Sequence, residues 1–181
     1  MILDSLLLFS GGAAAPGNGD GATDSPTTGT QVSSNVIDLG IIGIPSFANG
    51  GGARDIGTGD DPSMKLMVTT TVAFLSGTSL QIVLQGAPDN GSGAPGTWTT
   101  MYTGPAVLEA TLIIGARLAD IDVPRPIAGQ ALPRFLRLEY VTVGTHTAGT
   151  LESAIVLDRN DQVVGTTGAI SGYRAGINVA N

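Results

Sequence analysis

The chain has 181 residues, with 27 glycines, 10 prolines, no cysteine and a formal net charge of -7. This length can bury one hydrophobic core of ordinary size. The absence of cysteine excludes disulfides, thiolate chemistry and cysteine-based zinc sites. Lys65 is the single lysine and the arginines are scattered, so we expect no binding to nucleic acid or to an anionic membrane surface.

The chain opens on a compact apolar segment, residues 1–9, which is broken only by Asp4 and Ser5. Residues 10–34 follow as a tether of small and polar residues. An apolar end on a flexible tether can reach a groove on another chain, so we expect a partner-binding anchor. Alternatively, the same segment forms the first strand of its own domain, because anchored termini are common. The proposed anchor side chains are Ile2, Leu3, Leu6, Leu7, Leu8 and Phe9.

Neither a cleaved leader nor a membrane span is expected. Asp4 interrupts the first apolar run and no Lys or Arg precedes it, whereas a secretory leader has a cationic start and an unbroken apolar stretch. No other apolar run approaches the ~20 residues of a spanning helix.

Short strands separated by turns dominate the middle of the chain. Both faces of residues 64–75 are largely apolar or Thr, which indicates a strand covered on both sides. Residues 80–85 and 134–143 alternate apolar and polar side chains, as half-buried strands do. Turns are predicted at 76–78 and 144–149. The remaining predicted strands are 35–43, 97–102, 108–116 and 150–157. Residues 120–126 are expected to be extended, as an edge strand or a connection, and a short helix is possible near 105–108.

These elements predict an all-β fold, a jelly roll or antiparallel β-sandwich with an extended N-terminal arm. A parallel βαβ arrangement is excluded because no amphipathic helical window separates the strands. We expect an N-terminal anchor and arm at 1–34, the β domain at 35–158 and a polar, glycine-rich tail at 159–181.

The sequence contains few residues that could carry catalysis. We therefore expect that the protein is not an enzyme and binds no cofactor. His146, the single histidine, lies in a predicted turn, and no Gly-x-Ser-x-Gly elbow surrounds any serine. Glu109, Glu139 and Glu152 lie on predicted strands, where outward, solvated side chains are the ordinary arrangement.

Two loops invite comparison with ligand sites, and only the first remains a candidate. The Asp-rich residues 55–61 could surround a Ca²⁺ ion with oxygen ligands, although they do not match the EF-hand spacing. Residues 50–52 are three glycines, but no Gly-Lys-Ser/Thr follows them, so a phosphate loop is not indicated.

Four segments together resemble the capsid cement (decoration) proteins of short-tailed bacteriophages, the family of the Bordetella phage cement protein. They are residues 1–9, residues 34–40, residues 85–90 with 97–100, and residues 134–140.

This resemblance implies a jelly-roll domain on the outer surface of a phage head, made in the host cytoplasm. It also implies two kinds of partner: a major capsid protein of the HK97-type fold, whose neighbouring subunits are clamped together, and copies of the same chain in a dimer or trimer. No catalytic residue is implied.

Two other functions remain open from the residues. A carbohydrate-binding β-sandwich of the adhesin type would use Trp98, Tyr102 and loop carboxylates, although only 4% of the residues are aromatic. A hydrolase is the weakest alternative, because the sequence has a single histidine and no motif that would supply a catalytic nucleophile.

Overall fold

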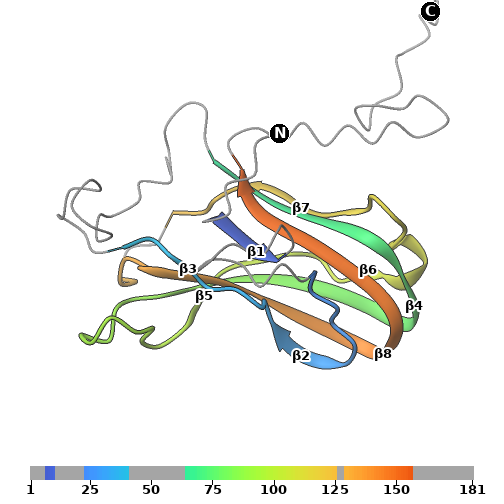
Figure 1. Ribbon diagram of the computed structural model, residues 1–181, viewed down its shortest axis with the longest axis horizontal. Coiled ribbons are helices and arrows are strands. Elements are labelled where there is room, and N and C mark those ends of the chain that lie inside the picture. Colours follow the sequence, from blue (N-terminus) through green and yellow to red (C-terminus); the bar gives the residue numbers. More distant parts are fainter. Residues whose placement is uncertain (1–6, 11–22, 41–63, 126–128, 157–181) are drawn as a thin grey trace, which may run out of the picture.

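A computed structural model describes residues 7–10, 23–40, 64–125 and 129–156 of the chain. These residues form eight β-strands and one 3₁₀ turn, and the strands pair antiparallel throughout, which confirms the all-β prediction (Figure 1). The elements in chain order are β1 (Leu8–Ser10), β2 (Gly29–Val32), β3 (Ile37–Asp38), β4 (Lys65–Ala87), β5 (Thr99–Thr103), β6 (Val107–Leu108), η2 (Glu109–Thr111), β7 (Arg117–Asp122) and β8 (Phe135–Val156).

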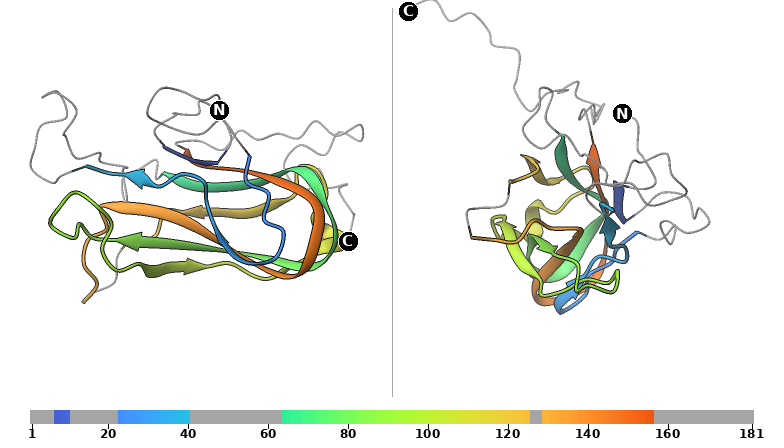
Figure 2. Two further views of the ribbon diagram at one scale, coloured as in Figure 1. Left: turned by 60° about the horizontal axis from the view of Figure 1, so that its bottom comes forward. Right: turned by 90° about the vertical axis from the view of Figure 1, so that its left-hand side faces the viewer.

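Two long strands, β4 and β8, organise the whole fold. β4 has 23 residues and β8 has 22, and they pair along almost their full length, from Lys65 opposite Val156 to Ala87 opposite Phe135. Their register shifts repeatedly between Thr70 and Ser79, and such irregularities bend a sheet. Both strands therefore turn over together at this bend, as the left view of Figure 2 shows.

The bend divides the sheet into two antiparallel layers. In the first layer, β1 pairs with the C-terminal half of β8, and β7 pairs with the N-terminal half of β4. In the second layer, β2 and β3 pair with the N-terminal half of β8, and β5 and β6 pair with the C-terminal half of β4. A single curled sheet thus makes the sandwich, because the two central strands belong to both layers.

The main core lies between the two layers and is built by strand alternation. Every second residue of each long strand points inward, where apolar side chains are removed from water. The fully buried members contributed by β4 and β8 include Leu66, Val68, Leu80, Ile82, Leu84, Leu136, Leu138, Leu151 and Ile155.

The bend itself is held by two close contacts between an aromatic ring and a glycine. A Cβ on Gly77 would lie 2.0 Å from the His146 ring, and a Cβ on Gly149 would lie 2.3 Å from the Phe74 ring. The two rings meet edge to face, with centroids 5.1 Å apart. Only glycine leaves room for these rings, so the glycines of the predicted turns serve to pack aromatic side chains.

Several predicted elements differ from the structure. The predicted turns at 76–78 and 144–149 are bends inside continuous strands, because the two glycine-containing segments lie opposite each other in the sheet. The predicted strand 108–116 contains only the last residue of β6, followed by η2 and a turn, and the predicted extended segment 120–126 is partly β7. His146, which the sequence places in a turn, is only 2% exposed.

The folded part also begins earlier than position 35. The sequence places residues 23–34 in a tether, but Asp24 bridges Leu151 and β2 pairs with β8. The expected tail at 159–181 lies outside the described residues.

Candidate interaction surfaces

The expected N-terminal anchor is, where described, part of the domain's own core. Phe9 is 0% exposed and packs with Leu7 between the two layers, and Leu8 packs outside the first layer with Met67. This is the placement expected of a first strand, so the anchor assignment is revised for Leu7, Leu8 and Phe9. Ile2, Leu3 and Leu6 lie outside the described residues.

A buried polar network fixes β1 in this position. The Ser10 hydroxyl donates to the Leu151 carbonyl at 3.1 Å and lies 2.7 Å from the Ser153 hydroxyl. The Tyr140 hydroxyl donates to Asp24 Oδ2 at 2.5 Å and lies 3.3 Å from the Ser153 hydroxyl. Since Tyr140 belongs to the second layer and Ser153 to the first, the network joins the two layers.

The same network controls the ionisation of Tyr140. Burial raises the pKa of Tyr140 well above its usual value, and the negative charge of Asp24 raises it further. The phenol is therefore held neutral, as a donor to the Asp24 carboxylate. Asp24 also accepts the backbone N–H of Ser34 at 3.0 Å, which ties the network to the segment that carries β2.

Residues 23–40 follow β8 along most of its length and form one edge of the molecule (Figure 1). The Leu151 N–H donates to the Asp24 carbonyl at 2.8 Å, and the His146 N–H donates to the Thr27 carbonyl at 2.8 Å. Beyond β2 and β3, the Leu39 N–H donates to the Arg134 carbonyl at 2.8 Å. This edge segment therefore turns with β8 through the bend.

An ion-pair cluster closes the end of the sandwich opposite the bend. The Arg134 guanidinium binds both carboxylate oxygens of Asp38, at 2.8 and 2.9 Å, and also pairs with Asp89. The backbone N–H groups of Gly93 and Gly91 lower the pKa of Asp89, and Arg134 lowers it further. Arg134 thereby joins β3 to the loop that follows β4.

The residues considered for catalysis are not brought together. Glu139 and Glu152 lie on the outward faces of opposite layers, since their β8 neighbours Leu138 and Ser153 point inward, and Glu109 is in η2. His146 is sealed in the bend, where its Nε2 lies 3.4 Å from the Ser79 carbonyl. Within the described ranges, no three His, Asp or Glu residues gather to hold a metal ion. The loops 50–52 and 55–61 lie outside those ranges.

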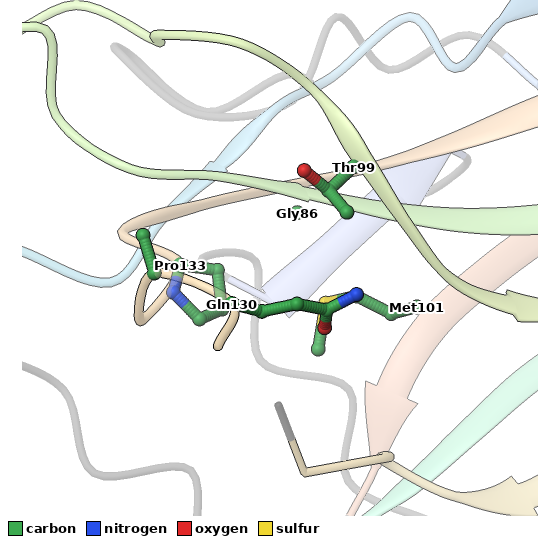
Figure 3. A pocket seen from close by; sticks show the side chains of 6 residues that line it. Gly86, Thr99, Met101, Gln130 and Pro133 are labelled. Carbon is green, nitrogen blue, oxygen red and sulfur yellow. The ribbon is translucent and has the colours of Figure 1, made fainter. Parts of the chain in front are cut away.

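The hollows of the described surface differ in size. Thr99, Met101, Gln130 and Pro133 surround Gly86 in the pocket of Figure 3. Its volume of about 10 Å³ admits one water molecule at most. A larger hollow of about 420 Å³ lies beside β2; it is lined by Asp24, Ser25, Pro26, Thr30, Gln31, Val32 and Tyr140. Among the described elements, no helix is long and apolar enough to cross a membrane.

One face of the Trp98 ring is already covered from within the domain. The Arg137 guanidinium lies over its ring, 4.2 Å from the centroid, and Arg137 Nε donates to Gln85 Oε1 at 2.8 Å. Tyr102 packs partly buried against the main core. The two aromatic residues considered for carbohydrate binding therefore already have partners within the domain.

Several of the most exposed apolar side chains lie on β4 near the bend or on residues 108–114, which run beside β4. The Phe74 N–H donates to the Leu112 carbonyl at 3.0 Å, and the Gly115 N–H donates to the Thr70 carbonyl at 2.8 Å. These bonds hold the turn of residues 112–115 against β4, with two consecutive isoleucines at its tip. We define the bend surface as Val72, Leu75, Leu108, Ile113 and Ile114, which are 47–68% exposed.

Sequence reasoning missed the bend surface. The run Leu112-Ile113-Ile114 falls in a predicted strand, where burial would be ordinary. The available signal was Gly115 directly after the two isoleucines, since glycine after an apolar run indicates a turn. Gly115 has a φ of 78°, the left-handed conformation that favours glycine.

The comparisons with known proteins identify a family. Residues 22–155 match the family model Bbp16, a span that covers well over half of the chain and ends within β8. The family's name points to a protein of a Bordetella bacteriophage. Among curated proteins, none matches the chain. The chain belongs to the Bbp16 family.

Proposed function

We propose that this chain is a capsid cement protein, which binds the outer surface of a phage head and clamps neighbouring major capsid subunits together. Two observations support the proposal: the family is a phage family by name, and four segments of the sequence resemble capsid cement proteins. The proposed partners are a major capsid protein of the HK97-type fold and other copies of this chain.

The bend surface is the observation that carries this proposal. Five aliphatic side chains, each about half exposed or more, lie on β4 near the bend and on residues 108–114, which run beside β4, in a protein whose net charge is -7. Exposed apolar patches on soluble domains commonly mark contacts with other proteins. In this proposal the bend surface has the role that the sequence assigns to the N-terminal anchor, of which Ile2, Leu3 and Leu6 lie outside the described residues.

The structure around the bend surface favours a rigid binding surface. The isoleucine turn is bonded to β4, and β4 carries no charged residue from position 66 to position 87. A preformed surface loses little conformational freedom on binding, which favours affinity. Many copies on one shell would add avidity to a modest contact at each site.

The test uses capsids assembled from the major capsid protein without this chain. Purified wild-type chain is expected to co-sediment with these capsids. The Ile114→Asp variant should have a dissociation constant that is higher by on the order of tenfold or more, because burying one isoleucine contributes ~1.5–3 kcal/mol. Leu132→Asp is the matched control, since Leu132 is 65% exposed and lies away from the bend.

The outcomes separate the surface from the function. Binding of wild type and Leu132→Asp but not of Ile114→Asp supports the proposal. Equal binding of all three chains would show that the bend surface is not the contact. Failure of the wild-type chain to bind any capsid preparation would contradict the cement function itself.

A further inference from the structure

The six outer strands that the described residues form are not equally protected against pairing with another strand. β3 and β6 have only two residues each, and very short edge strands offer little to pair with. β1 is buried at every residue, and β7 carries Arg117, Asp120 and Asp122 and a register shift. β5 also pairs through a register shift. Bulges, charges and burial are the usual devices that prevent edge-to-edge association. β2 has none of them: it pairs without a shift, has no charged residue and is exposed at every position.

The backbone of β2 presents a regular row of outward-facing groups. The Ser33 N–H donates to the Leu138 carbonyl at 2.8 Å, and Thr142 Oγ1 donates to the Gly29 carbonyl at 2.8 Å. Odd-numbered residues of this segment therefore face β8. Because backbone groups alternate in an antiparallel pair, the N–H and C=O groups of Thr30 and Val32 point away from β8, toward the open edge.

Charge favours a second copy of this chain as the occupant. Two molecules that each carry a net charge of -7 repel one another over most of their surfaces. Residues 25–37, which contain β2, carry no charged side chain. The exposed side chains of Val32 and Val36 add apolar contact area on the same segment. Two copies can thus approach along this edge without placing like charges together.

We propose that β2 of one copy pairs antiparallel with β2 of a second copy, about a two-fold axis through Gln31. In this register Thr30 of each copy lies opposite the other copy's Val32, so that all outward backbone groups of both residues are bonded. The second layers of the two molecules become one continuous sheet. A two-fold interface uses the same patch on both chains and closes at a dimer.

This inference deepens the self-association in the proposed function, but it is tested without any capsid. Sedimentation velocity of the purified chain over a concentration series is expected to show a monomer–dimer equilibrium. Val32→Glu should raise the dimer dissociation constant by about tenfold or more, since it adds a repelling charge within the paired strand. Thr99→Glu places the same charge on exposed residue 99 of β5, the opposite edge of the layer, and should leave the constant unchanged.

A mixed sample tests the register. Thr30→Lys alone should also weaken the dimer, and an equimolar mixture of Thr30→Lys and Val32→Glu chains should restore it, because the introduced ammonium and carboxylate groups would face each other across the axis. Circular dichroism and melting curves confirm that each variant is folded. The inference would be overturned if the wild-type chain stays monomeric or forms trimers. It would also be overturned if Val32→Glu leaves the dimer intact, or if Thr99→Glu weakens the dimer as much as Val32→Glu does. Capsid binding in the preceding test would be unaffected by that failure.

Discussion

Tyr140 joins both layers of the sandwich through one hydroxyl group. It donates to Asp24 on the edge segment and lies within hydrogen-bonding distance of Ser153, which in turn contacts Ser10 of β1. Buried polar groups are costly unless they are paired, so each member of this network requires the others. The network specifies where the N-terminal strand docks, which apolar contacts alone would leave less defined.

The first prediction concerns Tyr140 and pH. The usual tyrosine pKa is 10.0 and the folded value is higher. Above pH 10 the unfolded chain therefore releases a proton that the folded chain retains, and the free energy of unfolding falls as the pH rises. Tyr140→Phe should cost about 1–3 kcal/mol at pH 7, by removing a donor from the buried Asp24. It should also lose less further stability between pH 7 and pH 10.5 than the wild type.

Urea unfolding at the two pH values measures both effects. Ser153→Ala is the control, because it disturbs the same network but keeps the ionisable phenol, and it should retain the wild-type alkaline loss. Equal alkaline loss in Tyr140→Phe and wild type would show that Tyr140 is not the group responsible.

At the scale of elements, β1 decides whether the N-terminal segment serves its own domain. Phe9 is completely buried between the layers, and β1 pairs with β8 at Ala154 and Ser153. An apolar segment followed by small residues fits a free anchor and a docked strand equally well. Only the position of its partners, about 140 residues later in the chain, distinguishes the two.

Phe9→Ala gives the second prediction. In the isolated chain it should lower the free energy of unfolding by about 3–5 kcal/mol, the usual cost of truncating a buried phenylalanine. Leu132→Ala, at a position that is 65% exposed, should change it by no more than about 0.5 kcal/mol. If Phe9→Ala unfolds at the same urea concentration as the wild type, β1 is not docked in solution. That result would favour the hypothesis that the N-terminal segment is a free anchor.

The long strands show where sequence reasoning succeeded and where it stopped. Alternation in residues 80–85 and 134–143 identified the correct strands and the inward faces, because burial on one face imposes a period of two. The same local pattern cannot separate a reversal from a bend, since Gly77 and Gly144 permit both. Their opposition across the sheet makes the bend, and that pairing is non-local.

The prediction for His146 failed for the same reason. Its neighbours in sequence are polar, which indicates a surface turn, whereas its neighbours in space are Phe74 and Gly77. The sequence does not reveal that a glycine on another strand leaves a space for the ring. The bend surface was missed likewise, because its five residues come from separate segments that only the fold brings together.

At the scale of the whole molecule, a charge-poor sandwich presents two chemically different contact regions. The bend surface is aliphatic, and the β2 edge offers uncharged backbone groups about the proposed two-fold axis. The aliphatic surface fits the proposed contact with capsid subunits, and the edge fits the proposed contact with a second copy. A protein with both could link neighbouring sites on a shell, which is the mechanical task of a cement protein.

Electron cryo-microscopy of phage particles that encode this chain shows directly whether the protein links neighbouring capsid subunits. We predict density for a two-layered β-sandwich on the outer surface of the head, with its bend surface against the major capsid protein and spanning adjacent subunits. Particles with intact, stable heads from which the sandwich is absent would contradict the cement function.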